Sequence, residues 1–157
     1  SRIAQAAFRD YIGHFHADPK LDNRSADAAY VEWAENNVRS CSASAPVLVA
    51  CCGPRSDTHS NVNGEEPDQQ TEPVGFLCLE RNGSETLEIT LKAVHPDMQK
   101  RGVYTALVGA AIEQARPLGA RQLVTSTQIN NYGVQRIWCR LGFAHFKSVY
   151  TFHKWYP

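Results

Sequence analysis

The stretch HPDMQKRGVYTALV, residues 95–108, joins an apolar, strand-like run to a helix-like run through a basic turn. The turn reads Gln99-Lys100-Arg101-Gly102, and the helical pattern begins at Val103 with no acidic residue in its first turn. Helices usually carry Asp or Glu there, because the macrodipole leaves partial positive charge at the N-terminus. A bound phosphate would satisfy the free N–H groups of such an end. Taken alone, the stretch is equally consistent with a solvated turn.

Apolar periodicity on both sides of this stretch predicts an α/β fold. Helical spacing covers residues 3–16, 25–40, 103–119 and 131–142, and strand-like runs cover residues 46–52, 73–80, 86–94, 120–129 and 143–155, the last as one or two strands. The turn between residues 80 and 86 contains Asn-Gly, a strong hairpin signal. Hairpin strands followed by alternating helices and strands predict a central mixed, mostly antiparallel sheet flanked by helices.

The strand predicted over residues 86–94 divides its side chains between two faces, because successive side chains of a strand point in opposite directions. The apolar set comprises Leu87, Ile89, Leu91 and Ala93, and the polar set comprises Glu88, Thr90 and Lys92. A regular strand would therefore bury the first set and direct all three polar side chains to the opposite face.

The remaining segments are predicted from local signals. In the second helix, Ser25 is the expected N-cap, and Tyr30, Trp33 and Val38 are the expected inward positions. Residues 53–72 are polar, rich in Gly, Pro and acid and without periodicity, which predicts an exposed and mobile loop.

Composition limits the class of protein. The chain has 157 residues, enough for one domain with a full core. Its 16 basic and 16 acidic residues give a net charge of zero, whereas nucleic-acid binding needs an excess of cations, so no nucleic-acid partner is expected. No apolar run reaches the length of a membrane span, so no membrane partner is expected either.

The cysteines predict a reducing environment. There are five, an odd number with one adjacent pair and no C-x-x-C spacing, which argues against a disulfide framework or a zinc site. We expect reduced thiols in a cytoplasmic protein, with Cys51, Cys52 and Cys78 buried in strands. The chain begins with Ser1 rather than Met, so we expect further sequence upstream.

The basic turn resembles a motif of the GNAT superfamily of N-acetyltransferases. Residues 99–104 are similar to the family's Q/R-x-x-G-x-G/A loop, which follows a strand, opens a helix and holds the pyrophosphate of coenzyme A. Residues 131–143 are similar to its N-x-x-A-x-x-x-Y-x-x-x-G-F segment, which lines the other side of the coenzyme cleft. A looser similarity over residues 15–38 and 149–155 points to the dTDP-fucosamine acetyltransferase-like branch. The superfamily normally begins with a strand, and the pattern of this sequence predicts none before the first helix. We therefore expect residues 1–157 to be a single acetyltransferase domain that forms the C-terminal part of a longer protein.

The resemblance implies acetyl-CoA as co-substrate, no metal, and a set of coenzyme-binding residues. The pyrophosphate is expected at Gln99, Lys100, Arg101, Gly102, Val103, Tyr104 and Thr105; the thioester arm at the backbone of Lys92, Ala93 and Val94; and further coenzyme contacts at Asn131 and Trp138. Asn131 is equally suited to a helix N-cap. The histidines are scattered and predict no metal cluster, and His153 is the one we would test. They are His14, His16, His95, His145 and His153.

Two residues depart from the family pattern. Tyr104 stands where the loop usually has Gly or Ala, so its side chain must point away from the pyrophosphate. Trp138 stands where the family often has a Tyr that protonates the leaving thiolate, and an indole cannot act as an acid near neutral pH. A core position explains Trp138 more simply. Tyr104, Tyr132 and Tyr150 are alternative acids, with Tyr150 as the preferred candidate, and solvent is a further proton source.

Glu88 is the candidate general base, because an ammonium must lose its proton before the amine attacks an acyl group. Its position matches the general-base Glu of several superfamily members; a strand carboxylate paired with Lys92 is the alternative. We predict an N-acetyltransferase for a small-molecule amine, with a nucleotide-linked amino sugar as the expected acceptor. Acetylation of a protein N-terminus or lysine, and a non-catalytic acyl-CoA sensor, are the alternatives. Formation of a homodimer is left open.

Overall fold

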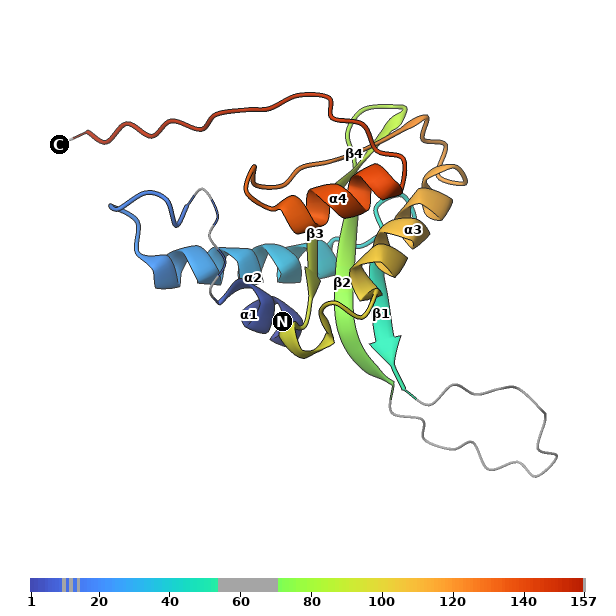
Figure 1. Cartoon of the computed structure of the whole chain (residues 1–157), viewed down its shortest axis with the longest axis horizontal. Coiled ribbons are helices and arrows are strands. Elements are labelled where there is room, and N and C mark those ends of the chain that lie inside the picture. Colours follow the sequence, from blue (N-terminus) through green and yellow to red (C-terminus); the bar gives the residue numbers. More distant parts are fainter. Residues whose placement is uncertain (10, 12, 14, 54–70, 157) are drawn as a thin grey trace.

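The structure is a computed structural model that describes residues 1–9, 11, 13, 15–53 and 71–156. Its elements follow in the order α1 (Arg2–Phe8), α2 (Asn23–Arg39), β1 (Val47–Cys52), β2 (Glu72–Arg81), β3 (Thr86–Val94), the 3-10 turn η1 (Pro96–Met98), α3 (Val103–Ala115), β4 (Gln122–Thr125) and α4 (Tyr132–Arg140) (Figure 1). His14 and all but the ends of the predicted 53–72 loop lie outside the described residues. None of the described helices is long and apolar enough to cross a membrane.

The four strands form one sheet in the order β1-β2-β3-β4. The pairs β1–β2 and β2–β3 are antiparallel, and β3–β4 is parallel. Helices α1 and α2 pack on one face of this sheet, and α3 and α4 pack on the other. The predicted mixed, mostly antiparallel sheet flanked by helices is therefore confirmed, including the β2–β3 hairpin with its Asn-Gly turn.

A β-bulge in β3 changes which side chains share a face. Leu77 pairs with Lys92 and Leu79 pairs with Ile89, so two steps along β2 correspond to three steps along β3. The extra residue lies between Ile89 and Lys92, and it reverses the alternation of side chains beyond that point. The regular alternation predicted for the whole strand is thus wrong: Ile89 and Leu91 point to opposite faces of the sheet.

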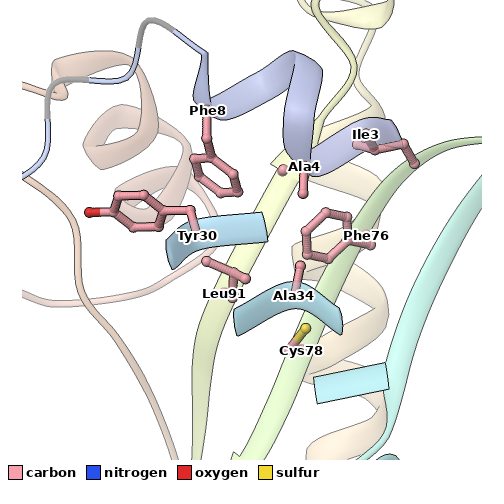
Figure 2. Close-up of a cluster of buried hydrophobic side chains, with 9 residues drawn as sticks. Ile3, Ala4, Phe8, Tyr30, Ala34, Phe76, Cys78 and Leu91 are labelled. Carbon is pink, nitrogen blue, oxygen red and sulfur yellow. The ribbon is translucent and has the colours of Figure 1, made fainter. Parts of the chain in front are cut away.

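Two hydrophobic clusters hold the helices against the sheet. The cluster under α1 and α2 consists of Ile3, Ala4, Phe8, Tyr30, Ala34, Phe76, Cys78, Leu91 and Ala93 (Figure 2). The cluster under α3 and α4 consists of Leu77, Leu79, Ile89, Val94, Leu107, Val108, Ala111 and Trp138. Successive residues of β2 thus alternate between the two clusters, because both faces of this strand are covered by helices and successive side chains point to opposite faces.

The N-terminal helices differ from their predicted form. The first helix ends at Phe8 rather than at residue 16, yet Tyr11 still packs edge-on against Tyr30, with 5.4 Å between ring centroids. Gly13 lies so close to Tyr30 that a Cβ there would be 2.3 Å from the phenol oxygen. The prediction of one helix over residues 3–16 is therefore wrong. The aromatic residues after Phe8 pack against Tyr30 from turns.

In α2 the N-cap is Asp22, whose side chain accepts a hydrogen bond from the Ser25 backbone N–H at 3.0 Å. Ser25 is therefore not the cap that the sequence predicted. Tyr30 is buried as expected, whereas Trp33 is 40% exposed and Val38 is 62% exposed. The small residues Ala26 and Ala34 are buried instead, at 6% exposure each.

Two further expectations fail at the edges of the sheet. Residues 143–156 form no strand, and their large apolar side chains are mostly exposed. Strand β4 has only four residues, so it offers a short edge for another strand to pair with. Cys51 and Cys52, at the end of edge strand β1, are exposed, while Cys78 in the central strand β2 is buried as predicted.

Candidate functional site

The basic turn between β3 and α3 has an unusual backbone. After the 3-10 turn η1, the chain passes through Lys100 with φ of 60° and Gly102 with φ of 84°. Glycine adopts such angles freely, but a lysine in this region is strained, and strain of this kind concentrates at functional sites. The Gln99 side-chain amide donates a hydrogen bond of 3.5 Å to the carbonyl oxygen of Val94, which ties the turn back to the end of β3.

This backbone leaves a run of hydrogen-bond donors without protein acceptors. Within the described residues, no group accepts a hydrogen bond from the backbone N–H groups of residues 100–105. Helix α3 has no capping side chain and no acidic residue in its first turn. Lys100 and Arg101 are exposed beside these donors. The N–H groups, the helix dipole and the two cations together favour an anion such as a phosphate.

Strands β3 and β4 part next to this turn. They pair only from Thr86 with Gln122 to Ile89 with Thr125, after which β3 continues and the other chain turns away. From Thr90 onward, β3 has no strand neighbour on that side within the described residues. The structure thus places Lys92, Ala93 and Val94 along an open strand edge that leads to the basic turn. We call the space where the two strands part the strand wedge.

The ammonium of Lys92 bridges the strand wedge. Its Nζ donates hydrogen bonds to Thr125 Oγ1 at 2.9 Å, to the Ser126 carbonyl oxygen at 2.8 Å and to the Ile89 carbonyl oxygen at 3.3 Å. It also lies 5.4 Å from the centroid of the Trp138 ring. Burial lowers the pKa of Lys92 to about 8, although the nearby Glu88 charge acts in the other direction.

Trp138 and Tyr104 form the wall of the strand wedge on the α3 and α4 side. The indole Nε1 of Trp138 donates a hydrogen bond of 3.0 Å to the Tyr104 hydroxyl oxygen. Trp138 is 9% exposed and belongs to the core, as its simpler interpretation predicted. The Tyr104 side chain points toward this core residue and leaves the loop backbone accessible. Burial raises the pKa of Tyr104 to about 12, so its phenol is a poor acid near neutral pH.

Glu88 lies on the other face of the sheet. It pairs with Glu80 across β2, on the face covered by α1 and α2, and its Oε2 accepts a hydrogen bond of 3.2 Å from the Asn82 side-chain amide. Glu80 in turn accepts a hydrogen bond of 3.2 Å from the Thr90 hydroxyl. The alternative of an ion pair between Glu88 and Lys92 is not formed, because the bulge separates the two side chains.

The remaining candidates are dispersed. Asn131 caps α4 by accepting a hydrogen bond of 3.4 Å from the Val134 backbone N–H, and it also donates one to Thr127. Tyr150 is 86% exposed on the C-terminal segment and makes no contact with the other candidates among the described residues. His153, on the same segment, forms a hydrogen bond with Asp18, which also accepts one of 3.0 Å from the Trp155 indole.

Sequence reasoning missed three residues around the site. Thr125 and Ser126 hold the Lys92 ammonium, and Glu80 shares its face with Glu88. Thr125 and Ser126 lie within the strand predicted over residues 120–129, but no local signal marks them as partners of Lys92, and Glu80 becomes a neighbour of Glu88 only once the hairpin register is known. An open hollow of about 600 Å³ between α1 and α2 is lined by charged residues of both signs and contains no candidate. No metal-binding group of His, Cys, Asp and Glu occurs in the described part of the chain.

Comparison with known proteins agrees with this geometry. Residues 54–143 match the acetyltransferase (GNAT) family. The spore coat polysaccharide biosynthesis protein SpsD of Bacillus subtilis is 26% identical over 141 residues, which cover 90% of this chain and 42% of that protein. An uncharacterised N-acetyltransferase of Methanocaldococcus jannaschii is 36% identical over 83 residues, covering 49% of this chain and 37% of the relative.

The fold has counterparts among solved structures. A structure of yncA from Salmonella typhimurium with its cofactor acetyl-CoA superimposes with a TM-score of 0.57 at 21% identity, covering 92% of this chain and 71% of the other. Because the family match spans more than half of the sequence, the chain belongs to the acetyltransferase (GNAT) family. It spans about two fifths of the length of the two curated relatives named above.

Proposed function

We propose that this chain is an acetyl-CoA-dependent N-acetyltransferase that transfers the acetyl group to a primary amine of a small molecule, with an amino sugar as the acceptor class. The observation that carries the proposal is the run of unpaired N–H groups over residues 100–105 beside an open edge of β3. Those donors fit a pyrophosphate, and the free edge fits an extended amide-containing arm such as pantetheine. Lys92, Ala93 and Val94 supply that edge, as the family resemblance implies.

The two faces of the sheet suggest separate approaches for the two substrates. The basic turn begins α3, so the coenzyme occupies the face that α3 and α4 cover. The acceptor then reaches the thioester through the strand wedge from the α1 and α2 face, where Glu88 lies. Glu88, directly or through water, takes a proton from the ammonium form of the acceptor. The neutral amine nitrogen attacks the acetyl carbonyl carbon and then loses its second proton to water, the carbon–sulfur bond breaks, and CoA leaves as a thiolate.

The acceptor class rests on two observations. A net charge of zero gives no field to attract a basic protein tail, which favours a small acceptor over a histone-like segment. The relative from Bacillus subtilis, similar over 90% of this chain, is named for polysaccharide biosynthesis. The first favours a small acceptor, and the second supports an amino sugar, including one linked to a nucleotide. Thiol release from acetyl-CoA, measured against a panel of simple amines, free amino sugars and nucleotide-linked amino sugars, tests this class directly.

Glu88→Gln tests the proposed base. We expect turnover to fall by about a hundredfold, because a general base contributes roughly that much, and the alkaline rise of the rate to flatten. Glu85→Gln is the matched control: Glu85 is an exposed carboxylate three residues away, 3.4 Å from the Arg121 guanidinium. An unchanged rate and pH profile in Glu88→Gln would remove Glu88 from the mechanism. Binding of CoA without thiol release for any amine would favour a non-catalytic sensor.

A further inference from the structure

The ammonium of Lys92 is held by neutral groups only. Its three acceptors are a hydroxyl and two backbone carbonyl oxygens, and the nearest ring is the Trp138 indole. No carboxylate lies within ion-pair distance of Lys92 in the described part of the chain. A half-buried cation without a counter-charge is costly, and an anion placed beside it would offset part of that cost.

The charged groups around Lys92 leave it as the proton source on this face. From β3, Glu88 points to the other side of the sheet. From β2, the residue paired with Lys92 is the apolar Leu77, and from β4, whose pairing with β3 ends at Ile89, the neutral Thr125 hydroxyl accepts a hydrogen bond from Lys92. From α3 and α4, Tyr104 and Trp138 bond to each other. The Tyr104 hydroxyl oxygen accepts that hydrogen bond, and burial raises the pKa of the phenol to about 12, which makes it a poor proton donor near neutral pH. Tyr150 is exposed on the distant C-terminal segment.

We propose that Lys92 is the proton donor to the CoA thiolate, and this rests on the proposed function. The carbon–sulfur bond of the tetrahedral intermediate breaks, its electron pair goes to sulfur, and a proton passes from Lys92 Nζ to that sulfur. Lys92 is left neutral and regains a proton from solvent, while the proton lost by the acceptor amine leaves on the opposite face through Glu88. The bulge between Ile89 and Lys92 is what allows one strand to carry the base on one face and the acid on the other.

The thiol of bound CoA tests this placement without any acceptor. A cation near the sulfur favours the thiolate, so we expect the thiol pKa of bound CoA to be lower than that of free CoA by about one unit or more. Thiolate absorbance of the protein saturated with CoA is recorded as the pH is raised. The same titration of the protein saturated with desulfo-CoA is subtracted, which cancels the signal of the protein's own cysteines. In Lys92→Met, the bound thiol should titrate like free CoA.

Lys147→Met is the matched control, since its ammonium also lies over an aromatic ring, 5.6 Å from the Phe146 centroid, but on the C-terminal segment. It should leave the bound thiol as in the unmodified protein. A thiol pKa in Lys92→Met equal to that of the unmodified protein would overturn the proposal. A failure of the unmodified protein to bind CoA in titration calorimetry would instead overturn the proposed function.

Lys92→Arg separates proton donation from charge alone and guards against a Met variant that fails to fold. Arginine keeps a cation and donors but does not release a proton near neutral pH. We expect Lys92→Arg to retain the lowered thiol pKa and to lose turnover by about tenfold to a hundredfold, with the alkaline fall of the rate abolished. Turnover and a pH profile equal to those of the unmodified enzyme would show that Lys92 does not donate the proton.

Discussion

The two faces of the sheet differ in what they leave open. Under α1 and α2, aromatic rings such as those of Phe8 and Tyr30, with centroids 4.9 Å apart, stack in the hydrophobic cluster (Figure 2). Under α3 and α4, the core gives way at the strand wedge to Lys92 and to the free N–H groups of the basic turn. Both faces thus combine packing with polar groups: the α1 and α2 face carries Glu88, and the α3 and α4 face carries Lys92 and the N–H groups that lack a protein acceptor.

The bulge in β3 connects the two faces. Without it, Glu88 and Lys92, four residues apart, would point to the same side of the strand and could pair with each other. With it, Glu88 lies on the α1 and α2 face and Lys92 on the α3 and α4 face. The comparison thus teaches that one extra residue in a strand can separate two oppositely charged side chains that would otherwise be able to pair.

The largest effects are expected from neighbouring core residues that face opposite sides. Phe76→Ala should lower the free energy of unfolding by about 3–5 kcal/mol, and Leu77→Ala by about 2–5 kcal/mol, because each leaves a cavity. At a temperature where both variants are folded, only Leu77→Ala should weaken CoA binding, since Leu77 pairs with Lys92. Urea denaturation and titration calorimetry measure the two quantities. An equal loss of CoA affinity in both variants would contradict the claim that the coenzyme binds on the α3 and α4 face.

An intermediate effect is expected from the pH dependence of stability. Burial lowers the pKa of Lys92 from 10.5 to about 8. Between these values the unfolded chain binds more protons than the folded one, so the contribution of Lys92 to the free energy of unfolding rises with pH. Relative to Lys92→Met, the unmodified protein should gain up to about 3 kcal/mol between pH 7 and pH 10. The free energy of unfolding of both proteins is measured by denaturation across this pH range. A difference between them that stays constant with pH would show that the ammonium is not desolvated.

The smallest effects come from two glycines with left-handed backbone. Gly102 has φ of 84° and Gly83 has φ of 89°, and a Cβ at either would meet no other atom within 4 Å. Alanine at each position should therefore cost about 1–2 kcal/mol of stability through backbone strain alone. Only Gly102→Ala should also weaken CoA binding, because Gly102 precedes α3 in the basic turn. A similar loss of CoA affinity in Gly83→Ala would indicate a general loss of structure.

Local signals in the sequence were enough to predict much of the sheet and the basic turn. The Asn-Gly turn defined the hairpin, and the absence of acid after Gly102 predicted the open N-terminus of α3. The position of Glu88 relative to Lys92 could not be predicted, because a bulge leaves the period of apolar residues almost unchanged: Ile89 and Leu91 are both buried, on opposite faces. The neighbours of Lys92 could not be predicted either, because Thr125 and Ser126 are brought close to it only by the parallel pairing of β3 and β4.

The ends of the chain were less predictable for a different reason. Helical spacing of aromatic residues continued to Phe15, but these side chains reach Tyr30 from turns that need Gly13 for close approach. The C-terminal segment has the composition of a strand, yet it pairs with no strand of the described sheet, and its His153 and Trp155 side chains form hydrogen bonds with Asp18. In both segments tertiary contacts outweighed local propensity.

Amide chemical shifts recorded during titration with CoA test the central claim most directly. The account predicts that the largest changes occur at residues 92–94 and 99–105, with the amides of Phe8, Tyr30 and the hollow between α1 and α2 nearly unaffected. Such a result would place the coenzyme on the α3 and α4 face, beside Lys92 and across the sheet from Glu88. Changes centred on the α1 and α2 hollow, or no saturable change at all, would contradict it.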